Sequence, residues 1–397
     1  MGTRQKNVLS CPGTCPHTLV RAYLCQHGAP PRLVSSFHGN GLVRLRYALF
    51  TAKRAHATLV LLTGFNETFL YYAKTISDLL QKGFNVATMD HRGQGLSDRE
   101  AAVRDTVHVA HVHSFDDYVR DAVYFIREVV CRDAAWHCKR VTVIGHSMGG
   151  HLALRLAAQH ADVVRSTVAL SPMLWIRTPL RLPHACMEIL AGGVCYGGYA
   201  TRGFWTRRHH LSALHHTIDT ANPKWNTITH SPASLRAIDR VRLLLPFVFV
   251  SPSYRWVYET CCAIRRMWRV HRTTLAASGA PVLMLTSGDD RYVDSDAARV
   301  FAEACPNVAC VEIPGAFHNL LLESTFARST ALEYLTGFAL NAHRHTCTIS
   351  GTTALAHSRS SWKQCRLFPA LLALLGTIVV TLTTANVCIF NVTERDS

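Results

Sequence analysis

Acidic residues are scarce in this chain. Its 397 residues include 26 Asp plus Glu against 42 Lys plus Arg, a formal net charge of +16, and charged residues of both signs make up only 17%. A basic excess of this size bears on partners such as nucleic acid or an anionic membrane rather than on the fold. Because hydrophobic residues make up 48% of the sequence, the composition excludes a disordered or collagen-like chain and allows a large buried core.

Metal-binding and secretory patterns are missing as well. The 14 cysteines include Cys131 with Cys138 and Cys305 with Cys310, and neither pair has the two-residue spacing of a zinc knuckle. The first 20 residues contain no apolar stretch of the length that a signal peptide needs. We therefore expect no zinc site and no cleaved secretory signal. The sequence also contains no internal repeat and no low-complexity block.

Apolar runs of strand length alternate with segments of helical spacing. The run at 57–65 stops at a glycine and is typical of a strand that is buried on both faces. Such alternation predicts an α/β fold with a mostly parallel, doubly wound sheet and helices on both faces. Strands are expected within 42–50, 57–65, 84–90, 140–150, 166–172, 280–288 and 307–315, and helices within 71–83, 115–130 and 151–160.

One stretch interrupts this alternation for about a hundred residues. Between Met173 and Gly279 the chain holds fourteen Lys plus Arg against four acids. A sheet needs no connection of this length, so the stretch is interpreted as an inserted cap or lid domain over a site. The predicted organisation is a 1–40 extension, a core of 41–173 and 280–340, a cap of 174–279, a linker of 341–366 and an apolar segment of 367–390.

The pentapeptide Gly145–Gly149 has the sequence Gly-His-Ser-Met-Gly, with Ser147 at its centre. An apolar strand pattern precedes it and an Ala- and Leu-rich helical pattern follows it. This is the context of a nucleophile elbow, in which a sharp strand-to-helix turn exposes the serine hydroxyl. Ser147 is therefore the predicted nucleophile.

A serine nucleophile needs a base, and the base needs an orienting carboxylate. In this type of fold the acid and then the histidine follow the serine along the chain. Three acids follow the strand at 280–288, namely Asp289, Asp290 and Asp294, and the pattern alone leaves all three open. His318 comes directly after the strand at 307–315 and is the predicted base. Both loops follow the carboxyl ends of strands, where open α/β sheets place their sites.

Acyl transfer also needs two donors for the developing oxyanion. We expect them to be the backbone N–H of Met148, directly after the nucleophile, and that of Phe65 in the loop 63–67. This chemistry requires no metal and no cofactor, and none is expected.

Several motifs outside the elbow are similar to those of a known family. They include Gly64-Phe65-Asn66-Glu67, the specific Asp90-His91-Arg92-Gly93-Gln94-Gly95, and Phe115-Asp116-Asp117-Tyr118-Val119. Over residues 40–340 the sequence resembles the lysophospholipase L2 and monoglyceride lipase branch of the serine α/β-hydrolases, often labelled serine aminopeptidase-like. The resemblance implies an α/β-hydrolase fold. It also implies Asp290 as the acid, because the family acid precedes an Arg, and His318 as the base.

Motifs at 229–231 and 252–257 resemble those of the lysophospholipase L2 cap, whereas Thr63-Gly64 departs from the His-Gly of monoglyceride lipases. The expected function is therefore a serine hydrolase that cleaves a carboxylic ester of a lipid, most simply a lysophospholipid. One alternative is a monoacylglycerol lipase or other carboxylesterase, and another is a non-catalytic, membrane-anchored binding protein. Expected partners are the lipid ester and membrane lipid, and not nucleic acid.

The stretch from 367 to 390 carries no charge. At about 1.5 Å per helical residue it is long enough for a bilayer core of about 30 Å. Arg359, Lys363 and Arg366 precede it, and Arg395 follows it. By the positive-inside rule this asymmetry predicts a single-pass transmembrane helix near the C-terminus, with the hydrolase domain in the cytosol.

Overall fold

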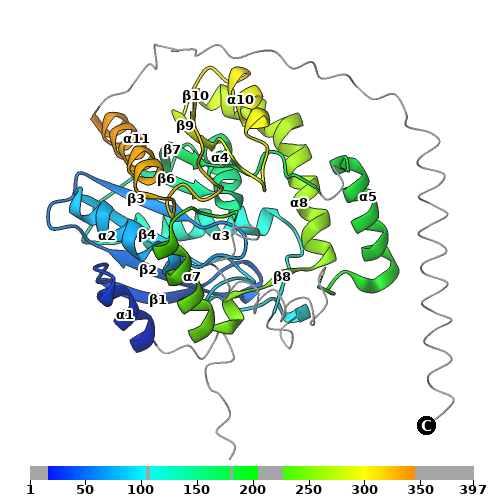
Figure 1. The fold of residues 1–397 in the computed structure, drawn as a ribbon, viewed down its shortest axis with the longest axis horizontal. Helices are drawn as coiled ribbons and strands as arrows, with labels where there is room; N and C mark the ends of the chain where they lie inside the picture. The colour runs from blue at the N-terminus through cyan, green and yellow to red at the C-terminus, as the bar shows by residue number, and fades with distance from the viewer. Residues whose placement is uncertain (1–16, 104–107, 179–181, 204–226, 345–397) are drawn as a thin grey trace, which may run out of the picture.

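The computed structural model describes residues 17–103, 108–178, 182–203 and 227–344, which are built around a sheet of eight strands (Figure 1). The strand order is β1-β2-β4-β3-β6-β7-β9-β10. Only β2 runs against its neighbours, and all pairings from β4 to β10 are parallel. The strands are β1 (Leu33–His38), β2 (Arg44–Phe50), β3 (Ala57–Leu62), β4 (Phe84–Met89), β6 (Val141–His146), β7 (Val164–Leu170), β9 (Val282–Ser287) and β10 (Val308–Ile313).

Helices cover both faces of this sheet, which explains why its central strands are buried along almost their whole length. In β3, Leu59 and Leu61 join one hydrophobic cluster, and Val60 and Leu62 join the other. The first cluster lies under α1 (His17–Gln26), α2 (Ala73–Gln81), α7 (Pro232–Leu244) and α11 (Thr325–Arg344). The second lies under α3 (Asp116–Tyr124), α4 (Met148–Gln159) and α10 (Ser295–Glu303). The prediction of an α/β fold with a mostly parallel sheet is confirmed.

The N-terminal region contains elements that the sequence pattern did not indicate. Only one strand was expected before residue 57, whereas α1 and β1 both precede it. In β1 only Phe37 is fully buried, so its apolar signal is weak. Antiparallel pairing with β2, with Phe37 opposite Leu45, holds it in the sheet.

Residues 174–279, here called the inserted segment, separate two strands that lie side by side in the sheet, β7 and β9. Figure 1 shows α5 and α8 next to each other at one end of the molecule. A second, two-stranded sheet joins the inserted segment to the core through β5 (Val109–Ala110) and β8. Besides α7, its described elements are α5 (His184–Val194), η8 (Cys195–Tyr199), η9 (Pro246–Val248), β8 (Ser251–Pro252), α8 (Tyr254–Arg266), η10 (Met267–His271) and α9 (Arg272–Ser278).

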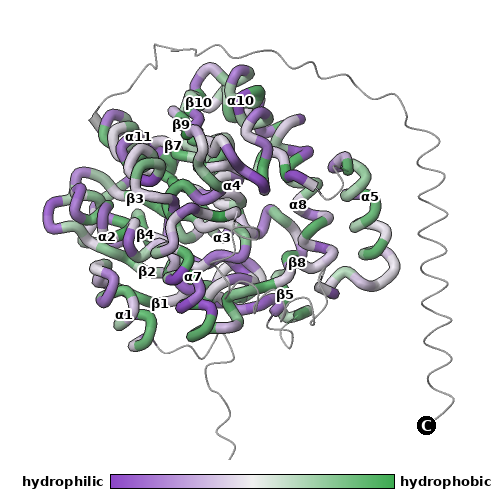
Figure 2. Tube along the Cα trace, viewed as in Figure 1, coloured by the Kyte–Doolittle hydropathy of each residue, from purple (hydrophilic) through white to green (hydrophobic). Residues whose placement is uncertain are grey.

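The outer helix of the inserted segment is rich in apolar residues. Figure 2 shows hydrophobic residues along α5, whose sequence is HACMEILAGGV. Only His184 and Ala191 of this helix are buried, and Ile189 is 56% exposed. Its packing partner is α8, where the Tyr258 ring lies against Gly192. The helix therefore contributes little to the core.

The predicted membrane topology is wrong. Among the described helices none is both long enough and apolar enough to cross a bilayer. The longest, α11, has 20 residues but carries Arg328 and Glu333 and packs on β7. It also extends to Arg344, beyond the expected start of the linker at 341. The predicted span at 367–390 lies outside the described residues.

The turn between β6 and α4 consists of a single residue. Strand β6 ends at His146 and α4 begins at Met148, so Ser147 alone reverses the direction, with φ 52° and ψ −111°. A positive φ is strained for a residue with a side chain. Glycines allow the close approach, because a Cβ at Gly145 would lie 2.1 Å from the carbonyl oxygen of Gly149, and one at Gly149 would lie 2.2 Å from that of Leu62.

Gly145→Ala should lower the free energy of unfolding by at least about 3 kcal/mol, because the new methyl group meets backbone that has no room to move. Gly337→Ala is the matched control, since a Cβ there meets nothing within 4 Å inside α11. It should raise stability by about 1 kcal/mol through helix propensity. Urea unfolding of both variants measures this, and equal midpoints would contradict it.

Candidate active site

The structure brings His318 and Asp290 into contact at one edge of the sheet. Asp290 follows β9, His318 follows β10, and these strands are parallel neighbours. The His318 Nδ1 atom lies 2.7 Å from the Asp290 Oδ2 atom. Both residues are buried, with exposed fractions of 7% and 5%. The pair has the geometry of a base whose ring is oriented by a carboxylate.

Of the three acids that the sequence left open, only Asp290 faces the histidine. Asp289 is exposed. Asp294 caps α10, where its side chain accepts a hydrogen bond from the backbone N–H of Asp296. The three acids are close in sequence but have three different environments.

The Asp290 carboxyl is held in its ionised form. Burial raises its pKa, but the hydrogen bond with His318 and the backbone donors outweigh burial, so the pKa lies below its usual value. Those donors are the N–H groups of Tyr292 and Val293, at 2.8 and 3.0 Å from Oδ1. An ionised carboxylate in this position fixes the imidazole tautomer and stabilises an imidazolium.

The residue that precedes Ser147 lies beside this pair. The ring of this residue, His146, has its centroid 4.7 Å from that of His318. The backbone N–H of Ser147 donates to the carbonyl oxygen of Leu170 in β7. The side chain itself is partly exposed. The nucleophile turn and the histidine loop are therefore adjacent.

The loop that carries Phe65 is held on both sides of that residue. The N–H of Gly64 donates to Glu67 Oε2, and the N–H of Asn66 donates to Gln94 Oε1 at 2.6 Å. The Phe65 ring packs on Trp256 of α8, with centroids 4.1 Å apart. Met148, the other residue expected to donate to an oxyanion, is the first residue of α4. An N–H in the first turn of a helix has no preceding carbonyl to bond.

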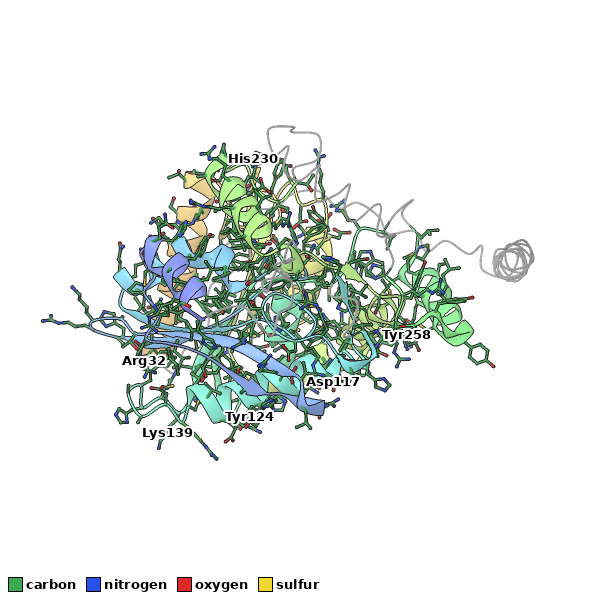
Figure 3. The ribbon with its side chains drawn as sticks, turned by 90° about the horizontal axis from the view of Figure 1, so that it is seen from below. Arg32, Asp117, Tyr124, Lys139, His230 and Tyr258 are labelled. Atoms are coloured by element: carbon green, nitrogen blue, oxygen red, sulfur yellow. The ribbon has the colours of Figure 1, made fainter. Side chains whose placement is uncertain are left out.

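The motif at 229–231 attaches the inserted segment to the histidine loop. The Thr229 hydroxyl donates to the Leu322 carbonyl, and the His230 Nδ1 atom lies 2.7 Å from Glu323 Oε1. The His230 ring stacks on Phe317, next to His318, with centroids 3.6 Å apart. His230 is labelled in Figure 3. This motif therefore supports the loop that carries the base.

The motif at 252–257 has a similar role on the other side of the site. Ser253 caps α8 by accepting a hydrogen bond from the Trp256 N–H, and its hydroxyl lies 3.0 Å from His111 Nδ1. The nearby Val250 N–H donates to the side chain of Asn66 at 2.8 Å. The inserted segment thus contacts the loop of Phe65 through two of its residues, Val250 and Trp256.

Sequence reasoning missed an ion pair that includes His146, the residue before Ser147. Glu67 Oε1 lies 3.0 Å from His146 Nδ1. Burial raises the Glu67 pKa, but attraction to His146 and hydrogen bonds outweigh it and bring the pKa down from 4.5 to about 2. Burial lowers the pKa of His146, but Glu67 outweighs it and the pKa lies above its usual value. Both residues stand in quoted motifs, yet their pairing joins positions far apart in sequence.

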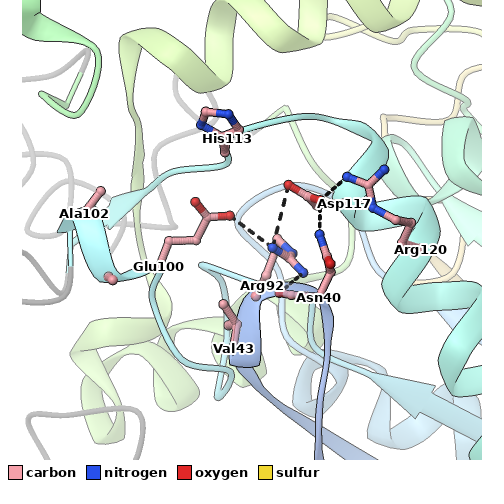
Figure 4. Close-up of a pocket in the computed structure, with 10 residues that line it drawn as sticks. Asn40, Val43, Arg92, Glu100, Ala102, His113, Asp117 and Arg120 are labelled. Carbon is pink, nitrogen blue, oxygen red and sulfur yellow. Dashed lines mark hydrogen bonds and ion pairs between the residues drawn. The ribbon is translucent and has the colours of Figure 1, made fainter.

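Arg92, from the motif at 90–95, lines a separate cavity of about 360 Å³ (Figure 4). Its guanidinium pairs with Asp121 at 2.6 Å, Glu100 at 3.2 Å and Asp117 at 3.8 Å. The lining of this cavity includes neither Ser147 nor its candidate partners. Because three carboxylates balance the positive charge of Arg92, we interpret the motif as a structural element that connects α3 to the loop after β4.

A comparison with protein families matches residues 53–325 to the family described as serine aminopeptidase, S33. The chain belongs to this S33 family. Among curated relatives, lysophospholipase L2 of Escherichia coli K12 is 28% identical over 327 residues, which cover 78% of this chain and 87% of the relative. The probable lysophospholipase L2 of Haemophilus influenzae is 25% identical and covers 70% and 82%. The resemblance inferred from the motifs is thereby confirmed.

Solved structures of other members of this fold are similar to this S33 chain. A soluble variant of monoglyceride lipase from Saccharomyces cerevisiae superposes with a TM-score of 0.61 at 17% identity, covering 79% of this chain and 96% of the lipase. A monoacylglycerol lipase of Paleococcus ferrophilus gives 0.56 at 20% identity, covering 75% and 99%. At these identities the likeness establishes the α/β-hydrolase fold alone.

The geometry of this S33 site predicts that Asp290→Asn lowers kcat for ester hydrolysis by about four orders of magnitude, through loss of the charge that orients the base. Asp289→Asn is the matched control, since Asp289 is adjacent but exposed, and it should keep its activity. Steady-state kinetics with a p-nitrophenyl ester measures both. A crippled Asp289→Asn beside an active Asp290→Asn would contradict this assignment.

The low pKa of Glu67 predicts a pH-dependent contribution to stability. Because the folded-state pKa is about 2 and the usual value is 4.5, ionised Glu67 stabilises the fold above about pH 4.5 and loses this effect as the pH falls toward 2. Glu67→Gln resembles the protonated residue. The difference in unfolding free energy between wild type and this variant should therefore shrink between pH 6 and pH 3, as measured by urea unfolding. A difference that grows toward low pH would refute it.

Proposed function

We propose that this chain is a serine hydrolase that cleaves a carboxylic ester of a lipid through an acyl-serine intermediate. The observation that carries the proposal is the buried pair of His318 and Asp290 beside a serine whose φ is positive. A structural turn has no need of both features. Backbone strain and histidines paired with a carboxylate are found together at active sites more often than elsewhere in proteins.

In the first half of the reaction His318 takes the proton of the Ser147 hydroxyl while Oγ attacks the ester carbonyl carbon. The electron pair of the carbonyl moves to its oxygen, which the N–H groups of Phe65 and Met148 stabilise. His318 then gives its proton to the departing alcohol as the ester bond breaks. Asp290 stays ionised and stabilises the imidazolium throughout.

In the second half water replaces the alcohol. His318 takes a proton from the water as it attacks the acyl carbon, and a second oxyanion forms on the same carbonyl oxygen. Collapse of this intermediate breaks the bond to Ser147 Oγ, which recovers the proton from His318. The fatty acid leaves and the enzyme returns to its starting state. No step requires a metal or a cofactor.

The inserted segment is assigned the role of a cap over this site, with residues 174–279 as its bounds and 41–173 and 280–340 as the core. Two contacts favour this role: Trp256 packs on Phe65, and the Val250 N–H binds Asn66. Both attach the segment to the loop that would bind the oxyanion. Substrate selection would then lie with the inserted segment.

A lysophospholipid is the preferred substrate class. Two relatives named lysophospholipase L2 share 28% and 25% identity with the chain over most of its length. The segment from Met173 to Gly279 carries fourteen Lys plus Arg against four acids, and such an excess favours a headgroup that bears a phosphate. Monoacylglycerol, the substrate class named by the structurally similar lipases, is the alternative.

One experiment tests both the mechanism and the substrate class. Purified protein should hydrolyse lysophosphatidylcholine or lysophosphatidylethanolamine faster than monoacylglycerol, a short p-nitrophenyl ester or a prolyl amide. A fluorophosphonate should abolish this activity and label the wild type but not Ser147→Ala, because the probe reacts with an activated serine.

Labelling that survives Ser147→Ala would refute Ser147 as the nucleophile. Absence of both labelling and hydrolysis would refute the serine mechanism and leave a non-catalytic binding protein. Preference for monoacylglycerol over every lysophospholipid would replace the substrate class while leaving the mechanism intact.

A further inference from the structure

We infer that Glu67 and His146 are positioning residues that hold the oxyanion loop, the nucleophile turn and the histidine loop in a fixed relation to one another. The inference rests on the proposed serine mechanism. Neither side chain would touch the substrate. They would act through the backbone groups and neighbours that they bind.

Three separate parts of the chain meet at the Glu67 carboxylate. Oε2 accepts from the N–H of Gly64 at 2.5 Å, which fixes the loop of Phe65. Oε1 lies 3.0 Å from His146 Nδ1, in the nucleophile turn, and accepts from Asn319 Nδ2 at 2.9 Å, in the histidine loop. Residues adjacent to Phe65, Ser147 and His318 are thus joined through one functional group.

His146 extends the connection to the backbone of the catalytic base. Its Nδ1 faces the Glu67 carboxylate, and its Nε2 lies 3.2 Å from the carbonyl oxygen of His318. Both of these partners are acceptors, and an imidazolium, which carries a hydrogen on each ring nitrogen, would satisfy both of them. A charged ring between Glu67 and His318 holds both more firmly than a neutral one.

Tyr72 and Asn319 complete the network. The Tyr72 hydroxyl donates to Glu67 Oε2 at 2.6 Å and accepts from Asn319 Nδ2 at 2.9 Å. Tyr72 and Asn319 are fully buried, and His146 is 1% exposed. Water has little access to replace any lost hydrogen bond, so removing one member is costly and shifts the others.

This arrangement bears on catalysis because oxyanion stabilisation is sensitive to distance. The donors must lie about 3 Å from the developing charge, and a displacement of about 1 Å can cost two orders of magnitude in rate. A carboxylate that binds the neighbours of Phe65, Ser147 and His318 fixes those distances before substrate arrives. Its loss should weaken binding of the transition state more than binding of the substrate.

Glu67→Gln tests this with p-nitrophenyl butyrate and an alkyl trifluoromethyl ketone, which forms a tetrahedral adduct with an activated serine. We expect kcat to fall by about 100- to 300-fold, within the range for a lost oxyanion donor, with KM within threefold of wild type. Affinity for the ketone should fall by the same factor as kcat/KM. If Glu67 were only a structural residue, its substitution would lower the unfolding temperature without lowering kcat at nearly constant KM.

Glu100→Gln is the matched control. The Glu100 and Glu67 side chains have the same exposed fraction, 12%. Glu100 also forms an ion pair with a cationic side chain, that of Arg92. Its variant should keep wild-type kcat. If Glu67→Gln fails to fold, Tyr72→Phe removes one donor to Glu67 while keeping the ring, and it should lower kcat severalfold. Tyr71→Phe, whose hydroxyl instead binds Arg242, is its control and should not.

The double variant Glu67→Gln, His146→Gln should be no slower than the worse single variant, because both changes disrupt one unit. Unchanged kcat in Glu67→Gln, a rise in KM alone, or additive losses in the double variant would each overturn the inference. A wild type that neither hydrolyses esters nor reacts with fluorophosphonate would instead refute the proposed function. The two failures are therefore distinct.

Discussion

The close approach of α4 to the ends of β3 and β6 is the constraint on which the rest of the site depends. The distance is so short that neither Gly145 nor Gly149 has room for a side chain. Helix α4 must therefore begin directly after the strand, which leaves Ser147 with a positive φ. The folding energy of the sheet thus maintains the strained backbone conformation at Ser147.

Around this turn, the polar contacts extend outward in two layers. The inner layer joins backbone groups next to Phe65 and His318 through Glu67 and His146. The outer layer attaches the inserted segment to the same two loops, through Val250 and Asn66 on one side and through residues 228–230 on the other. A change in the inserted segment would therefore act on the loops that carry Phe65 and His318.

The positions of most strands follow from local patterns, whereas much of the site follows from contacts that no local pattern contains. Apolar runs and glycines located the strands of the main sheet other than β1, together with the turn at Ser147, and the family resemblance pointed to Asp290. Position alone did not separate Asp290 from Asp289, because only the folded loop turns one carboxylate toward His318. The pairing of Glu67 with His146 spans 79 positions and has no periodic signature. Hydropathy also predicted a membrane span at 367–390, outside the described residues, whereas no described helix is both long enough and apolar enough to cross a bilayer.

The adjacency of β7 and β9 has a consequence for how such a protein can diverge. The inserted segment begins and ends at neighbouring strands, so its two ends stay close together whatever lies between them. The entropy cost of closing a loop rises only with the logarithm of its length, by about 0.6 kcal/mol for each doubling. Insertions and deletions there therefore cost the core little. Evolution can therefore replace the inserted segment while the sheet and the loops at its edge stay unchanged.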